Sequence, residues 1–149
     1  MKILDSTKSD ELRCNYIINF VDTSLNYYKE KIEKKELFSD GACYIGYLWD
    51  CLLSPRMISE TIAEHLLQGK RSVYIMWDIH SCDRIFIPDY WKFPKNAVLF
   101  ADAWKDTFRR ELPEDIYVFD DTLSWSVIFT HETDEKAESY CLFVDKRPK

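Results

Sequence analysis

The sequence predicts an α+β fold in which N-terminal helices pack on one face of a mostly antiparallel sheet built from the C-terminal half. Two observations predict this class. Apolar residues recur with helical spacing in the first half of the chain, whereas short β-branched and aromatic runs separated by turn residues follow residue 72. Helices first and a meander of strands last are typical of an α+β domain. No internal repeat or Pro-rich linker divides the 149 residues, so we expect a single domain over 1–149.

The first expected element is a long amphipathic helix over 9–35. Apolar side chains recur there at alternating steps of four and three residues, which places them on one helical face. They are Cys14, Ile18, Val21, Leu25, Tyr28 and Ile32. Thr7 followed by Asp10 resembles an N-terminal capping box. We expect this face to pack onto the core of the domain, and an adaptor that pairs with another chain through the same face is an alternative.

Two shorter helices are expected next. The nearly apolar stretch 44–53 follows a turn signal at 39–41 and indicates a buried helix. A second helix is expected over 55–68, with Ser54 as its N-cap and Gly69 at its C-terminal end.

Strands dominate the expected structure of the rest of the chain. The run 72–79 predicts a central strand, because most of its residues are β-branched or aromatic. Further strands are expected over 85–87, 97–100, 116–119, 125–130 and 140–144. A helix over 102–110 is expected to stop before Pro113.

Composition and charge limit the classes of function. The chain is 46% hydrophobic and 15% aromatic, as a folded domain is and a disordered chain is not. Its formal net charge of −6 disfavours general affinity for nucleic acid and favours a cationic partner. No apolar run approaches the ~18 residues of a membrane-spanning helix, and Asp5 precedes any apolar run that a signal peptide needs. We therefore expect a cytoplasmic protein that binds neither nucleic acid nor membrane.

Common motifs for metal, nucleotide and hydrolase chemistry do not occur. The five cysteines are odd in number and contain no CxxC pair, which excludes a disulfide framework and the usual zinc and redox motifs. Gly41 and Gly46 have the spacing of a phosphate-binding loop, but Tyr47 and Leu48 replace its Lys and Ser/Thr. No GxSxG elbow is present. We expect neither a cofactor nor a metal ion.

One constellation of chemically active residues survives this screen. Asp78, His80 and Cys82 alternate, so their side chains share one face if the strand over 72–79 continues that far. Such residues can hold a metal ion or form a Cys/His nucleophile pair, and His131 can join them from a later strand. The segment 81–84 has turn character, which favours a hydrogen-bonding role instead. A small metal-dependent or Cys/His enzyme is the alternative function.

Acidic residues gather in the C-terminal half. Between Ala101 and Glu138 there are 11 acidic residues against 4 basic ones, and such a surface attracts cationic partners. Large aromatic side chains beside charge are the usual anchors of protein interfaces. The predicted partner-binding residues are Trp91, Trp104, Asp102, Asp106, Asp120 and Asp121. The alternative is that the acids provide solubility and the aromatics belong to the core.

A distinctive string covers residues 112–132 and reads LPEDIYVFDDTLSWSVIFTHE. An LPE-type turn leads into a strand, an acidic turn and a strand of the form W-x-x-x-x-T-H-E. The string resembles the C-terminal signature of small bacterial immunity proteins that accompany polymorphic or contact-dependent toxins. The resemblance implies a cytosolic protein that binds a cognate toxin domain, often a basic nuclease, and blocks it without chemistry of its own. It identifies no functional residue, and the identity of the toxin and the oligomeric state stay open.

Overall fold

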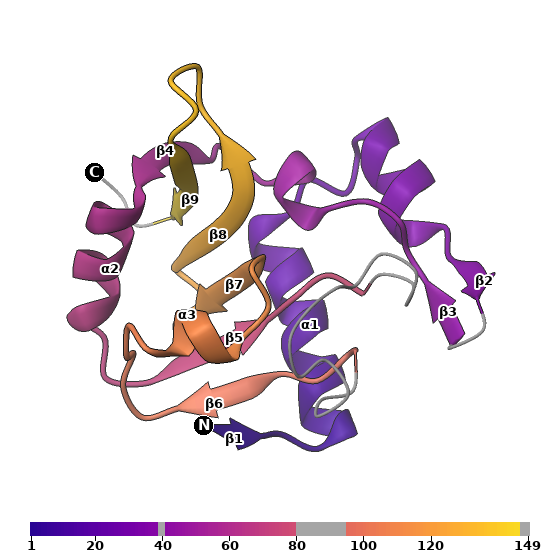
Figure 1. Ribbon diagram of the computed structural model, residues 1–149. Helices are drawn as coiled ribbons and strands as arrows, with labels where there is room; N and C mark the ends of the chain where they lie inside the picture. Colours follow the sequence, from indigo (N-terminus) through magenta and orange to yellow (C-terminus); the bar gives the residue numbers. More distant parts are fainter. Residues whose placement is uncertain (39–40, 80–94, 147–149) are drawn as a thin grey trace.

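The computed structural model describes residues 1–38, 41–79 and 95–146. A seven-stranded sheet forms its centre, with the strand order β1-β6-β5-β7-β8-β9-β4 and antiparallel pairing throughout (Figure 1). The sheet strands are β1 (Lys2–Ile3), β4 (Arg56–Ser59), β5 (Val73–Met76), β6 (Leu99–Ala101), β7 (Ile116–Phe119), β8 (Trp125–Thr133) and β9 (Ser139–Asp145). The other elements are α1 (Ser6–Phe20), η1 (Tyr28–Glu33), the hairpin of β2 (Glu36–Phe38) and β3 (Gly41–Cys43), η2 (Leu48–Cys51), α2 (Glu60–Gln68) and α3 (Phe108–Glu111). The predicted α+β class is confirmed.

The centre of the sheet is buried on both faces. All four residues of β5 and all four of β7 are buried, so each face of the sheet needs apolar cover. On one face, Val73 and Ile75 belong to a cluster with Ala63 and Leu67 of α2, and α3 packs into the same cluster. On the other face, α1, η1 and η2 cover the alternate strand residues. The helices are therefore divided between the two faces, with α3 in front of the sheet and α1 behind it in Figure 1, which refines the predicted arrangement on one face.

The C-terminal strands agree best with the prediction. β7 has the predicted bounds 116–119, and β8 and β9 extend the predicted 125–130 and 140–144 by a few residues. β5 is shorter than 72–79, and β6 begins two residues later than 97. The predicted strand 85–87 lies outside the described residues.

The first helix is shorter than predicted and buries a different face. It begins after Asp5, whose carboxylate accepts a hydrogen bond from the Lys8 amide at 2.7 Å, so the predicted cap at Thr7 and Asp10 is wrong. It ends at Phe20, and η1 is a separate element. The buried residues of α1 are Ser9, Leu12, Arg13, Tyr16 and Phe20. Cys14 and Ile18 of the predicted stripe are exposed, because the larger Tyr16 and Phe20 rings occupy the core instead.

The segments predicted as the second and third helices contain less helix than expected. Only Leu48–Cys51 is helical within 44–53, as a single 3-10 turn. Within 55–68, the first residues form β4, which pairs with β9, and α2 starts only after Ser59. The Ser59 hydroxyl accepts a hydrogen bond from the Ile62 amide at 3.1 Å, so Ser59 and not Ser54 is the N-cap.

The helix predicted over 102–110 is reduced to α3, Phe108–Glu111. Along the described part of the chain, no helix is long and apolar enough to cross a membrane.

Candidate functional site

Asp78 lies just after β5 and is 6% exposed. Its Oδ1 accepts hydrogen bonds from the Tyr44 hydroxyl and the Leu48 amide, both at 3.0 Å. Its Oδ2 accepts one from the Tyr117 hydroxyl at 2.6 Å, and that hydroxyl accepts one from the Trp49 amide at 3.1 Å. The carboxylate therefore holds η2, and the segment before it that contains Tyr44, against the central strands β5 and β7.

The two phenols at Asp78 stay protonated. Burial raises the pKa of Tyr44 and of Tyr117 well above the usual value, and the negative charge of Asp78 acts in the same direction. Both hydroxyls are thus available as donors at any physiological pH. This geometry is that of a structural acceptor, the hydrogen-bonding role that the sequence favoured for the end of this strand.

Of the other residues of the predicted enzyme constellation, the structure describes His131, which is not brought to Asp78. His80 and Cys82 lie outside the described residues. His131 lies near the end of β8, where its Nδ1 is 2.8 Å from Oδ2 of Asp115 and its Nε2 is 3.7 Å from Oε1 of Glu132. Across residues 1–38, 41–79 and 95–146, no three His, Cys, Asp or Glu side chains are grouped so that they could hold a metal ion.

His131 is part of a second cluster, which sequence reasoning missed. The rings of Tyr47 and Trp49 stack at a centroid distance of 4.2 Å, and each meets the imidazole edge-on at 5.6 and 5.5 Å. Tyr140 lies on β9 beside this end of β8, where its carbonyl accepts a hydrogen bond from the Thr130 hydroxyl at 3.2 Å. Burial raises the pKa of Tyr140, and the charges of Glu132 and Asp50 add to this shift. We call this cluster the His131 patch and define it as Tyr47, Asp50, Asp115, His131, Glu132 and Tyr140.

The backbone before η2 positions the aromatic part of the His131 patch. The Tyr47 amide donates to the Tyr27 hydroxyl at 2.9 Å, and that hydroxyl donates to Oδ2 of Asp50 at 3.1 Å. A side chain at Gly46 would place its Cβ 2.6 Å from Cβ of Lys31, so only glycine permits this close approach of η1. The sequence showed His131 and Glu132 at the end of a strand, but no local signal linked them to Tyr47 and Asp50, which lie more than eighty residues earlier.

The charge on His131 depends on pH. Burial disfavours the imidazolium, but the hydrogen bond and charge of Asp115, helped by Glu132 and Glu114, outweigh burial and raise the pKa of His131. Burial also raises the pKa of Asp115, and the hydrogen bond from His131 opposes that rise. The ion pair therefore exists between the two raised pKa values.

We expect the pKa of His131, measured from its imidazole NMR signals, to lie above about 6.5 and to fall when Asp115 is replaced by Asn. Because the folded-state pKa of His131 is the higher one, the stabilisation by the pair is complete from above the raised pKa of Asp115 up to about pH 6.5, and it disappears as the pH rises through the raised pKa of His131. The pair is partly exposed and screened by solvent, so its contribution is about 0.2–1 kcal/mol. An unchanged pKa in the Asp115→Asn variant would contradict the role given to Asp115.

The predicted acidic residues gather at the opposite end of the sheet from His131. β6 and β7 both run antiparallel to β5, one on each side, so their C-terminal ends lie at the same end of the sheet. Asp102 follows β6, and Asp120 and Asp121 follow β7. Asp102, Asp106 and Asp121 are exposed, while Asp120 is half-buried and accepts a hydrogen bond from the Thr122 amide at 2.9 Å. Asp102, Asp120 and Asp121 therefore lie at the same end of the sheet.

Of the two predicted aromatic anchors, the structure describes Trp104, which is buried. Trp104 is 6% exposed, its ring stacks on Phe129 at a centroid distance of 5.6 Å, and its Nε1 donates to Oε2 of Glu64 at 2.6 Å. It belongs to the core between the sheet and the helices α2 and α3, so the expectation of an exposed anchor is corrected at this position. Trp91 lies outside the described residues.

Comparison with known proteins adds no family to this geometry, because neither a protein-family model, nor a curated protein, nor a solved structure matches the chain.

Proposed function

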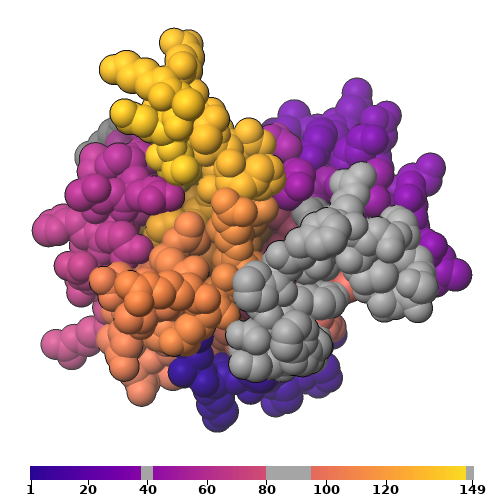
Figure 2. All heavy atoms as spheres, in the orientation of Figure 1, coloured from indigo at the N-terminus to yellow at the C-terminus, as the bar shows by residue number. Residues whose placement is uncertain are grey.

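We propose that the protein is an immunity-type inhibitor that binds a basic bacterial toxin domain, such as a nuclease, through an acidic and aromatic surface. The observation that carries the proposal is the position of the β8–β9 hairpin. This hairpin projects beyond the sheet (Figures 1 and 2), and the His131 patch lies at its base. A convex acidic element is complementary to the concave cationic groove with which a nuclease holds its substrate.

The exposed part of the hairpin is strongly acidic. Between the end of the buried part of β8 and the start of β9, the acidic residues are Glu132, Asp134, Glu135 and Glu138, and Lys136 is the one basic residue. All except Asp134 are exposed, and Asp134 is half-buried. The excess of negative charge is therefore at the most prominent point of this face, where it can guide a cationic partner before contact.

The hairpin has an ordered conformation before any partner binds. Oδ1 of Asp134 accepts hydrogen bonds from the Lys136 and Glu138 amides at 2.8 and 3.0 Å, and Ala137 has a positive φ of 59° that closes the turn. At the base, Tyr47 offers a half-buried ring whose position is already set by its stacking on Trp49. A surface that is ordered in advance loses less conformational entropy on binding.

The aspartates predicted from the sequence have a supporting role in this proposal. Asp102, Asp106, Asp120 and Asp121 keep their assignment as partner-binding residues, acting through long-range attraction. Lys70 and Arg71 lead into β5 at the same end of the sheet, so the local charge there is mixed. On the hairpin four acidic residues stand against one basic residue, Lys136, and we place the centre of the interface there.

The experiment starts with affinity capture from the native organism and with the protein encoded by the neighbouring gene as the candidate partner. We expect a 1:1 complex whose association slows with added salt. Reversing two hairpin charges, Glu132→Lys with Glu135→Lys, should slow association at low salt at least about tenfold and weaken its salt dependence. Stopped-flow or surface plasmon resonance at two ionic strengths measures both effects.

The matched control is Glu30→Lys with Glu36→Lys, which changes the net charge equally at exposed positions on η1 and β2. Equal slowing by both pairs would show a general effect of net charge and reject the hairpin as the interface. If Asp120→Lys with Asp121→Lys slowed association more than the hairpin pair does, the interface would lie at the opposite end of the sheet.

The enzyme alternative stays a prediction. It needs His80 and Cys82, which lie outside the described residues. Stoichiometric metal in the purified protein, together with no captured partner, would favour it over the inhibitor.

A further inference from the structure

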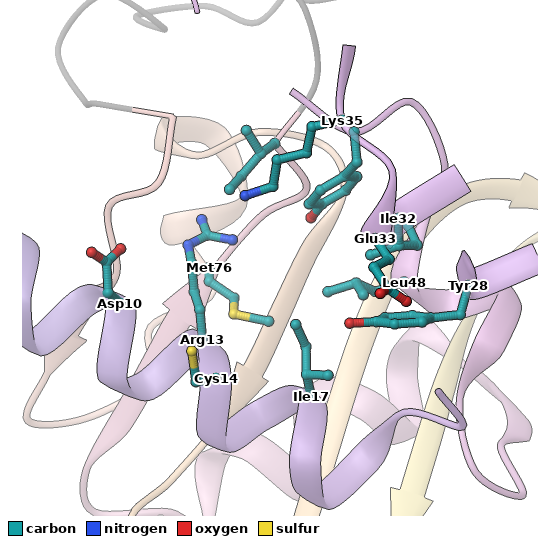
Figure 3. Close-up of a pocket in the computed structure, with 12 residues that line it drawn as sticks. Asp10, Arg13, Cys14, Ile17, Tyr28, Ile32, Glu33, Lys35, Leu48 and Met76 are labelled. Carbon is teal, nitrogen blue, oxygen red and sulfur yellow. The ribbon is translucent and has the colours of Figure 1, made fainter. Parts of the chain in front are cut away.

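A cavity of about 540 Å³ lies between α1, η1 and the end of β5, apart from the acidic surfaces described above (Figure 3). Its apolar lining is formed by Ile17, Ile32, Leu48, Met76 and Ile79. Its polar lining includes Arg13 and Lys35. The volume lies in the range of roughly 300–1,000 Å³ that small-molecule pockets occupy, and an apolar wall with a few polar groups is their usual composition.

Arg13 reaches the cavity from α1 and is 8% exposed. Its guanidinium donates to four backbone carbonyls, those of Asn96 (2.9 Å), Trp77 (2.9 Å), Lys95 (3.1 Å) and Ala97 (3.3 Å). A guanidinium carries five N–H groups, and among the described residues none accepts the second hydrogen of Nη1. One donor of a buried cation is therefore available to a ligand.

The positive charge of Arg13 is only partly balanced by the acids around it, Asp78 and Asp10. In the part of the chain that the structure describes, no carboxylate lies within the 4.0 Å of an ion pair with its guanidinium. Burial lowers the pKa of Arg13, and the electrostatic effects of Tyr44, Asp78 and Asp10 only partly oppose it. Because buried charges in proteins are normally paired, this one favours an anion beside it.

A second cation points to the same end of the cavity. Figure 3 shows the amino group of Lys35 turned toward the guanidinium of Arg13, and both residues line the cavity. Asp10 and Glu33 also line it, but Figure 3 places their carboxylates to either side of the two cations. Because both cations line the same cavity, an anion bound there is attracted by both charges.

We propose that this cavity binds an amphipathic carboxylate, a small molecule with one carboxylate and a medium-length aliphatic body. The carboxylate accepts hydrogen bonds from Nη1 of Arg13 and from Nζ of Lys35. The aliphatic body lies against Ile17, Leu48 and Met76. The ligand's negative charge, rather than its apolar body alone, is what the site recognises.

The test compares three probes of equal chain length, octanoate, octanol and octylamine, by isothermal titration calorimetry on the full chain. We expect octanoate to bind at least about tenfold more tightly than octanol, because a hydrogen bond to a charged group is stronger than one to a neutral group. Octylamine should bind more weakly than octanol. Equal affinities for all three probes, or no binding of octanoate, would overturn the proposal.

A variant and a protection assay locate the binding without disturbing the buried arginine. Lys35→Gln should weaken octanoate binding about threefold to tenfold and leave octanol unchanged, whereas Lys34→Gln, outside the cavity lining, should change neither. Cys14 is exposed and lines the cavity, so octanoate should slow its alkylation by iodoacetamide, read from the Cys14 peptide by mass spectrometry. Octanoate that binds without protecting Cys14, or that is equally weakened by both lysine variants, would place the ligand elsewhere and reject this site.

Discussion

Replacing Arg13 with methionine should lower the free energy of unfolding by about 3–5 kcal/mol. The methionine fills the volume of the aliphatic stem but removes the hydrogen bonds that Arg13 donates to four carbonyls, at the strand end at Trp77 and in the segment 95–97. At least two of these bonds are fully buried, so water cannot replace the donor at little cost. Urea unfolding followed by tryptophan fluorescence measures the loss.

Two further variants test this explanation of the Arg13 effect. Arg13→Lys keeps the charge but offers three donors on one nitrogen in place of the planar fork, and it should recover only part of the stability. Lys8→Met removes a cation from the same helix at a side chain that is 43% exposed, and it should change the stability by no more than about 0.5 kcal/mol. If Arg13→Met and Lys8→Met were equally mild, the carbonyls would be satisfied by water and the fastening role of Arg13 would be wrong.

Arg13 also explains why the buried face of the first helix was predicted wrongly. A hydrophobic pattern counts arginine as polar, which places position 13 on the exposed side and selects the stripe that begins at Cys14. The carbonyls that Arg13 binds are 64 to 84 residues away along the chain, so no local signal could reveal that its burial is satisfied. Because Arg13 was assigned to the solvent side, the predicted buried face of α1 lies on a different side of the helix from the observed one.

The C-terminal strands were predictable because their signals are local. β7 is a short apolar run between Pro113 and an Asp-Asp-Thr turn, and β8 and β9 flank a turn of polar residues. The two clusters of polar residues could not be predicted in the same way. The Asp78 network joins residues 30 to 39 positions apart, and the His131 patch joins η2 to the end of β8, so both exist only after the sheet has formed.

Asp78→Ala is the second substitution with a large expected effect. It removes the acceptor of two buried phenols and of the Leu48 amide, and each buried donor left without a partner costs about 1–3 kcal/mol. We expect the free energy of unfolding to fall by about 3–5 kcal/mol, with the matched control Asp50→Ala on the exposed side of η2 close to wild type. Urea unfolding measures both variants.

The same position separates the structural role of Asp78 from the enzymatic one. In Asp78→Asn the side chain keeps its shape and loses its charge, so Oδ1 can still accept while the amide nitrogen meets a hydroxyl donor. A structural acceptor predicts a stability loss between those of wild type and Asp78→Ala, and a double-mutant cycle with Tyr117→Phe should give a coupling of about 1–3 kcal/mol, because both residues share one hydrogen bond. A metal ligand or catalytic group predicts instead a variant of nearly wild-type stability that has lost metal or activity.

Since the carboxylate holds η2 against β7, and η2 carries Trp49 and Asp50 of the surface beside His131, the stability loss should be accompanied by weaker partner binding even though Asp78 itself is buried.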